Sequence, residues 1–352
     1  MVPEETSDAV ALLQQLIAIP SFSREETAAA DFLERYIEIK GYVASRKENN
    51  IWILSSGFDQ SRPTILLNSH IDTVKPVAGW VRDPLRPTIE NGRIYGLGSN
   101  DAGASVVSLL HAFFYLTQKK QAYNLIFAAS AEEEVSGKNG IETLLQELPK
   151  IDFAIVGEPT EMNLAVAEKG LMVLDCVAIG KAGHAARNEG ENAIYKALED
   201  VSWFKNYVFK NKSDLLGEVK MTVTQINAGT QHNVVPDKCS FVVDVRSNEM
   251  YSNQEILNII LKQVSCNVQA RSTRLSSTAT PLNHAIVKRG LELNRSLFGS
   301  PTLSDQSLMP FPSLKMGPGQ SARSHTADEF ILLDEIAEAI EIYIQLLDGL
   351  EI

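Results

Sequence analysis

Three short, continuous and largely apolar runs constrain the fold of this chain more than any other feature of its sequence. They span residues 64–67, 125–129 and 153–156, and none of them alternates apolar with polar residues. Such runs are typical of parallel strands that are covered on both faces. Stretches with helical spacing lie between them, at residues 104–117 and 138–148. This alternation predicts a three-layer α/β domain with a mostly parallel central sheet.

The middle of the chain follows a different pattern. Residues 170–276 are expected to form, in order, a strand, a helix, two strands, a helix and a strand. This βαββαβ order is that of a ferredoxin-like module. Helical spacing then returns at residues 284–297 and 334–347, and these helices need a sheet to pack against. We therefore expect a discontinuous α/β domain, residues 1–169 and 277–352, with a ferredoxin-like domain of residues 170–276 inserted into it.

Composition limits the partners and the compartment of the protein. The chain has 44 acidic and 32 basic residues, a formal net charge of −12, and no basic stripe interleaved with aromatic residues that would favour nucleic acid. No apolar run is long enough to cross a bilayer, so we expect a cytoplasmic protein without a membrane partner. The three cysteines are widely spaced and indicate packing residues. A metal site would therefore use histidines and carboxylates.

Residues that can bind metals follow each of the three apolar runs. Ligand sites in open parallel sheets form at the carboxyl ends of the strands. The candidates are His70, Asp72, Glu132, Glu133, Glu134 and Glu158, and a glycine-rich loop before residue 104 adds Asp101. Each has an ordinary structural explanation when taken singly, such as a helix cap for Asp101 or a solvated helix start for the glutamates. Together they supply the nitrogen and oxygen ligands that zinc accepts.

Spacing separates some of the possible roles. Asp72 comes two residues after His70 on a strand, so it points the same way and can accept the ring N–H that a metal does not use. Glu132 and Glu133 point in different directions, so one can bind a metal while the other accepts a proton from bound water. The spacing leaves open which glutamate does which.

A set of longer segments is spread along the whole chain. They are NSHIDTV at 68–74, YGLGSND at 95–101, SAEEE at 130–134, VGEPT at 156–160, GKAGHAA at 180–186, NVVPDKCSFVVDVR at 233–246, GPG at 317–319 and SHTADE at 324–329. In this order they resemble the family of acetylornithine deacetylase, succinyl-diaminopimelate desuccinylase, aminoacylase and glutamate carboxypeptidase. The chain departs from the family at Leu97, where arginine is usual, and lacks a lysine-containing stretch after Asp101. Neither is a metal-ligand position, so we expect the chemistry to be retained.

The resemblance implies a pair of Zn²⁺ ions bridged by Asp101. One ion would also be held by His70 and Glu158, and the other by Glu133 and His325. Glu132 would then be the general base, and Asp72 would support His70. Because the same ligands accept Co²⁺ or Mn²⁺, either ion can substitute for zinc.

The resemblance also assigns roles outside the metal ligands. His184 would donate a hydrogen bond to the oxyanion, commonly in the site of a neighbouring subunit, and the inserted lid domain would form a homodimer. Asn233, Arg246 and Gly317 match positions that contact substrate, and an arginine suits bidentate binding of a carboxylate. Without the resemblance, a turn histidine, a turn asparagine and an exposed strand arginine would explain three of these residues as well.

These assignments predict a di-zinc hydrolase of linear amide bonds that acts on a small N-acyl amino acid. The resemblance favours N-acetyl- or N-succinyl-ornithine or -citrulline, in arginine biosynthesis. Succinyl-diaminopimelate, dipeptides and other acyl amino acids are alternatives within the same chemistry, and Lys169, Asp305 or Arg323 could help to choose among them. A non-catalytic ligand-binding homologue is the alternative from another class, and the complete ligand set argues against it.

Overall fold

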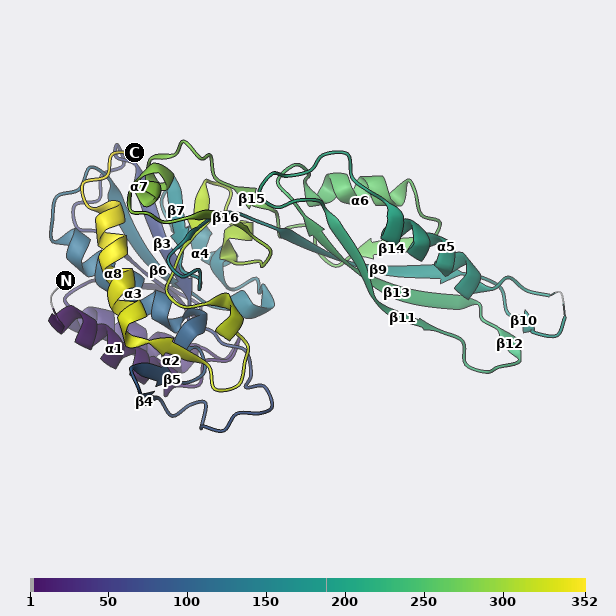
Figure 1. Cartoon of the computed structure of the whole chain (residues 1–352), viewed down its shortest axis with the longest axis horizontal. Coiled ribbons are helices and arrows are strands. Elements are labelled where there is room, and N and C mark those ends of the chain that lie inside the picture. The colour runs from purple at the N-terminus through teal and green to yellow at the C-terminus, as the bar shows by residue number, and fades with distance from the viewer. Residues whose placement is uncertain (1–2, 188) are drawn as a thin grey trace. The chain divides into compact units, whose positions relative to one another are not determined.

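The computed structural model describes residues 3–187 and 189–352, coloured from purple to yellow in Figure 1. The chain divides into two compact units. Unit 1 comprises the described residues up to 166 together with 280–298 and 304–352, and unit 2 comprises 167–279 and 299–303. Residues 299–303, which we expected in the α/β domain, therefore cluster with unit 2.

The central sheet of unit 1 confirms the predicted parallel core. Its strands follow the order β1 (Ser45–Lys47), β2 (Asn50–Leu54), β6 (Asn124–Ser130), β3 (Thr64–His70), β7 (Phe153–Val156), β17 (Ser313–Lys315) and β8 (Leu164–Glu168). The inner strands β6, β3, β7 and β17 run parallel, whereas β2 and β8 are antiparallel to their neighbours. Every residue of β3, β6 and β7 is buried, which explains the uninterrupted apolar runs within these strands.

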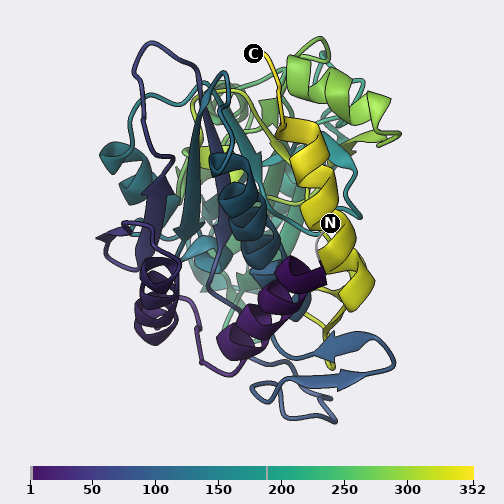
Figure 2. The same cartoon turned by 90° about the vertical axis from the view of Figure 1, so that its left-hand side faces the viewer.

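Helices cover this sheet. They are α1 (Pro3–Ile17), α2 (Thr27–Ile39), α3 (Ala104–Thr117), α4 (Ile141–Glu147), α7 (Ala285–Glu292) and α8 (Leu333–Leu347). Helices α1, α3 and α8 pack against one another over one face, where Figure 2 shows purple α1 and yellow α8 in front of the strands. Helix α4 packs through Ile141 and Leu144 into the apolar cluster that contains Leu66 and Ile126.

A small sheet brings the end of the chain to the glycine-rich loop. Strand β18 (Phe330–Leu332) pairs with β5 (Arg93–Tyr95), which pairs with β4 (Thr88–Glu90). The Gly96 N–H continues this pairing by donating to the carbonyl of Glu329 at 3.0 Å. Residues far apart in the sequence, 96–103 and 324–329, therefore meet in space.

Unit 2 contains the expected βαββαβ order of elements. The elements are β9 (Gly170–Ile179), α5 (Ala193–Asn206), β11 (Lys220–Ala228), β13 (Lys238–Ser247), α6 (Asn253–Leu261) and β14 (Asn267–Ala270). The four strands form an antiparallel sheet in the order β11-β13-β9-β14. Its core includes Phe204, Phe241 and Ile256 together with all three cysteines, which are free thiols. A separate two-stranded ribbon joins β10 (Gly183–His184) to β12 (Val234–Val235).

Within the described part of the chain, no helix combines the length and the apolar character needed to cross a membrane.

Candidate metal centre

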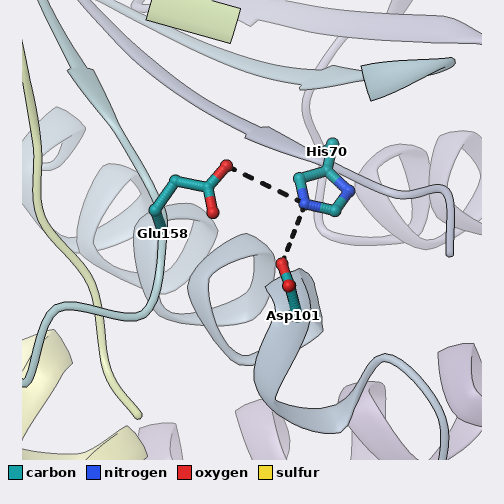
Figure 3. Close-up of side chains that lie close together, drawn as sticks. All are labelled: His70, Asp101 and Glu158. Carbon is teal, nitrogen blue, oxygen red and sulfur yellow. Dashed lines mark hydrogen bonds and ion pairs between the residues drawn. The ribbon is translucent and has the colours of Figure 1, made fainter. Parts of the chain in front are cut away.

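The first group of possible metal ligands lies at the carboxyl edge of the central sheet. His70 ends β3, Glu158 follows β7 by two residues, and Asp101 lies in the loop that precedes α3. The Nε2 atom of His70 is 3.2 Å from Oδ1 of Asp101 and 3.9 Å from Oε1 of Glu158. Figure 3 shows both carboxylates directed at this one ring nitrogen. The ligand atoms of all three residues lie within 4.8 Å of one another, so a single ion can reach them.

A second group shares Asp101 with the first. The Nε2 atom of His325 lies 3.0 Å from Oε2 of Glu134 and 3.7 Å from Oδ2 of Asp101. Asp101 thus offers one carboxylate oxygen to each group, which is the arrangement that a bridging ligand needs. Asp101, Glu134 and His325 also have ligand atoms within 4.8 Å of one another.

The glutamate that joins the second ligand group is one residue later in the run 132–134 than we expected. Glu134, and not Glu133, approaches His325 and Asp101. Glu133 is partly buried in the same cluster, where burial and the negative charges of Glu158 and its neighbours raise its pKa well above the ordinary value. The geometry therefore differs from the expected ligand set, because Glu134 and not Glu133 lies with Asp101 and His325.

Glu132 is turned away from the metal-ligand groups. The residue has a positive φ of 55°, which breaks the alternation of β6 directly after its end. Its carboxylate accepts hydrogen bonds from Nδ2 and the backbone N–H of Asn139, at 3.0 and 3.4 Å. A side chain at Gly137 would collide with this carboxylate, so the glycine makes room for it. Glu132 is thus a buried structural residue that fixes the loop 132–139.

Asp72 connects His70 with the glutamate run. The Nδ1 atom of His70 lies 2.9 Å from the backbone carbonyl of Asp72 and 3.5 Å from its carboxylate, so the predicted carboxylate contact is secondary to a backbone one. The Asp72 carboxylate instead accepts the hydroxyl of Ser23 at 2.7 Å and the N–H groups of Glu133 and Glu134 at 3.0 and 3.2 Å. A donating Nδ1 leaves Nε2 free to bind a metal, and the two N–H bonds orient the glutamates.

The electrostatics of the cluster fit a cationic cofactor. Burial, reinforced by the charge of Asp101, raises the pKa of Glu158 to about 8. Burial opposes protonation of His70, yet hydrogen bonds with Asp101 and Asp72 raise the pKa of its ring well above the ordinary value. The carboxylates therefore repel one another and draw protons onto their neighbours, a state that bound cations would relieve. Imidazole nitrogens and carboxylate oxygens sharing one aspartate suit two divalent ions.

The structure places His184, the expected oxyanion donor, next to Asn233, whereas Arg246 lies elsewhere in unit 2. His184 and Asn233 are exposed neighbours on the two-stranded ribbon, where the N–H of Ala185 donates to the carbonyl of Asn233 at 3.0 Å. Arg246 is the penultimate residue of β13, whereas the ribbon strand β12 lies just before the first residue of β13. The guanidinium of Arg246 forms a bidentate pair with Asp244 at 2.8 and 3.1 Å. A carboxylate ligand of Arg246 would have to compete with this pair.

Gly317 packs closely against the backbone of Glu158. A Cβ atom at position 317 would be 2.5 Å from the carbonyl oxygen and 3.0 Å from the backbone nitrogen of Glu158. The backbone of Gly317 also exchanges hydrogen bonds with Thr160. This close approach gives Gly317 a clear role in holding the Glu158 loop, in addition to any contact with substrate.

Internal interactions engage the three residues that we considered for substrate selection. Lys169 donates to the carbonyl of Glu218 at 2.7 Å, and Arg323 pairs with Glu335 at 2.7 Å. Asp305 is buried and accepts the hydroxyl of Ser130 at 2.5 Å, which places it beneath the sheet edge.

Comparison with known proteins agrees with this geometry. A family model described as peptidase family M20/M25/M40 matches residues 66–349. The chain belongs to this family. It is therefore a hydrolase, and its similarity to two relatives named as a hydrolase and a desuccinylase extends over nearly its whole length.

Three relatives illustrate the range of similarity. The chain is 27% identical over 351 residues to the [LysW]-lysine/[LysW]-ornithine hydrolase of Sulfurisphaera tokodaii, covering 96% of this chain and 94% of that protein. It is 27% identical over 362 residues to the succinyl-diaminopimelate desuccinylase of Corynebacterium glutamicum, covering 97% and 96%. The solved structure of the YXEP protein of Bacillus subtilis, a dinuclear metal binding peptidase, shares the fold with a TM-score of 0.74 at 15% identity and 98% coverage of both chains.

Several site residues escaped prediction from the sequence. Glu134 was among the possible metal ligands, but a run of three identical residues carries no sign of which one binds a metal. Ser23 and Asn139 hold Asp72 and Glu132 but lie outside any recognisable motif. Glu329 belongs to the segment SHTADE, and only the pairing of β18 with β5 shows what it contacts.

Proposed function

We propose that this protein is a di-zinc amidohydrolase that removes the acyl group from a small N-acyl amino acid. The observation that carries the proposal is the pair of ligand groups that share Asp101, with the partly buried Glu133 in the same cluster. His70, Asp101 and Glu158 would hold one ion, and Asp101, Glu134 and His325 the other. When bound, the two ions would lower the pKa of a water molecule and polarise the amide carbonyl.

Glu133 is the proposed general base. Its carboxyl group is surrounded by the charges of His70, Glu158, Asp305 and Glu134, so it lies among the ligands without belonging to either group. In the reaction, Glu133 removes a proton from the attacking water and then delivers it to the leaving nitrogen. The hydrogen bonds from the N–H groups of Glu133 and Glu134 to Asp72 fix the direction of both side chains during these steps.

The substrate proposal combines the resemblance with the relatives. The leaving groups in the names of the two sequence relatives are lysine, ornithine and diaminopimelate, all of which are diamino acids. We favour N-acetyl- or N-succinyl-ornithine, with the citrulline derivatives beside them and succinyl-diaminopimelate as the main alternative. His184 and Asn233 would act together on the scissile carbonyl, because the ribbon β10–β12 presents them side by side. Arg246 would bind a substrate carboxylate in exchange for Asp244.

A homodimer through unit 2 is part of the proposal. Strand β11 pairs only with β13 among the described strands, and most of its residues are exposed. Helix α5 also exposes Tyr195 and Leu198, at 68% and 52% of their surface. A long unpaired edge next to exposed apolar side chains favours association with another copy of the same surface.

The test is release of free amine from a panel of acyl amino acids. Protein stripped with a chelator and then reloaded with Zn²⁺ is incubated with the N-acetyl and N-succinyl derivatives of ornithine, citrulline and diaminopimelate. We expect activity only after reloading, with the highest kcat/KM on an ornithine derivative. Equal activity before and after chelation would refute the metal proposal. Activity confined to succinyl-diaminopimelate would replace the preferred substrate with the alternative.

A further inference from the structure

Glu329 holds the loop that carries Asp101. Its carboxylate is almost fully buried, with 2% of the residue exposed. One oxygen accepts the N–H groups of Asn100 and Asp101 at 2.8 and 2.9 Å, and the other accepts the N–H of Gly98 at 3.1 Å. The backbone from residue 98 to 101 is therefore wrapped around a single side chain, which fixes the position from which Asp101 projects.

The side chain of Asn100, in the loop before α3, forms hydrogen bonds with the segment that carries His325. Its side-chain Nδ2 donates to the carbonyl of Gln320 at 3.1 Å and to the hydroxyl of Ser324 at 3.2 Å. Its Oδ1 accepts the N–H of Gln320 at 3.0 Å. Ser324 immediately precedes His325, so the amide of Asn100 holds this segment at both ends.

The two contacts are reciprocal. Glu329, from the C-terminal segment, holds the loop before α3, and Asn100, from that loop, holds the C-terminal segment. Neither side chain belongs to the metal-ligand groups. Burial and the charge of Asp101 make a carboxylate at position 329 electrostatically unfavourable, and its hydrogen bonds with three N–H groups offset only part of that effect. A residue that served only to fill space here would not need to accept three backbone N–H groups.

We propose that Glu329 and Asn100 are positioning residues that hold Asp101 and His325 in place before metal binds. This inference rests on the proposed metal centre. Because Asp101 offers an oxygen to both groups, Glu329 controls the affinity of both ions. Asn100 acts on the His325 side and controls mainly the ion held by Asp101, Glu134 and His325. Partners that orient metal ligands in this way typically change metal affinity by roughly 10–100-fold when they are replaced.

The experiment measures Zn²⁺ binding by Glu329→Gln and Asn100→Ser, using calorimetry on chelator-treated protein. In Glu329→Gln the amide oxygen can still accept from Asn100 and Asp101, but the amide NH₂ faces the N–H of Gly98. We expect both ions to bind about 10–100-fold more weakly. In Asn100→Ser we expect the ion at His70 and Glu158 to bind with wild-type affinity and the ion at Glu134 and His325 to bind more weakly. The visible absorption spectrum of Co²⁺-loaded protein should change in both variants, because it reports the ligand geometry and not the overall stability.

Asp200→Asn is the matched control. Asp200 is buried in unit 2 and accepts the N–H groups of Ser265 and Cys266 at 2.9 and 3.0 Å, so it has the same chemistry as Glu329 at a site without metal ligands. Its replacement should lower the melting temperature and leave Zn²⁺ affinity unchanged.

The outcomes separate the two proposals. A wild-type protein that does not bind two ions refutes the proposed function itself. A wild-type protein that binds two ions, together with a Glu329→Gln variant of unchanged affinity and Co²⁺ spectrum, overturns the positioning role. Should Glu329→Gln fail to fold, the Asn100→Ser variant decides. Equal loss of affinity for both ions, or no loss for either, contradicts the positioning role of Asn100.

Discussion

Replacing Glu133 by glutamine should abolish turnover without removing the metal ions. The substitution preserves the size of the side chain, and Glu133 lies outside both ligand groups, so the metal content should stay at the wild-type value. A general base contributes about 10²–10⁴-fold to the rate. At about 1.36 kcal/mol for each factor of ten, this loss corresponds to roughly 2.7–5.4 kcal/mol in the activation free energy.

Glu132→Gln provides the decisive comparison, because it removes the same charge one residue earlier. The carboxylate of Glu132 accepts two hydrogen bonds from Asn139, and an amide can keep only one of them. We expect a stability loss of about 1–2 kcal/mol and a kcat that stays within roughly tenfold of wild type. Glu134→Gln should instead lose the ion that Asp101 and His325 help to hold.

The assay combines steady-state kinetics, metal analysis and chemical denaturation on all three variants. The expected pattern is inactive and metal-loaded for Glu133→Gln, active and less stable for Glu132→Gln, and metal-depleted for Glu134→Gln. The opposite pattern, with Glu132→Gln inactive and Glu133→Gln depleted of metal, would show that the orientation of the loop 132–139 has been assigned wrongly.

Three further predictions test other parts of the structure. Gly317→Ala should lower stability by about 1–3 kcal/mol and weaken metal binding, because the new Cβ presses on the backbone of Glu158; unchanged melting and zinc content would contradict this. Burial raises the pKa of Asp8, but side-chain hydrogen bonds, above all from Lys40, lower it by more, so the net pKa lies below the ordinary value. The charged carboxylate therefore stabilises the fold at a pH above the ordinary pKa, and this contribution is lost as the pH falls through the lowered pKa. Asp8→Asn should therefore cost about 1 kcal/mol at most at pH 7, since the pair is partly exposed, and the two unfolding curves should converge below pH 4. Ile226→Lys on the exposed strand β11 should convert the proposed dimer to a monomer in sedimentation velocity, whereas a monomeric wild type would disprove the dimer.

Most of the architecture follows from the sequence because burial leaves a direct pattern there. Strands covered on both faces are mostly apolar, and β3, β6 and β7 contain the three apolar runs. Helix α3 spans the predicted residues 104–117. The carboxyl ends of parallel strands lie along one edge of the sheet, so the sequence predicts that His70 and Glu158 lie close together.

Substrate recognition was less accessible, because it depends on which partners a polar side chain finds. Arg246 looked available for a carboxylate, but Asp244, two residues earlier on the same strand, occupies its guanidinium. Asp305 looked like a possible specificity residue, yet it is buried against Ser130. Such hydrogen bonds leave no periodic signal in the chain.

The sequence by itself determined the type of sheet, the βαββαβ order of unit 2 and the edge at which histidines and carboxylates meet, because periodicity and strand polarity encode these properties locally. Only the tertiary structure decided which glutamate of three consecutive ones faces the ligands. Identical residues carry no pattern that distinguishes them, and the choice depends on the left-handed backbone at Glu132 and on its contact with Asn139. The approach of Glu329 to the Asp101 loop was decided in the same way, by the pairing of β18 with β5, which are more than 200 residues apart in the sequence.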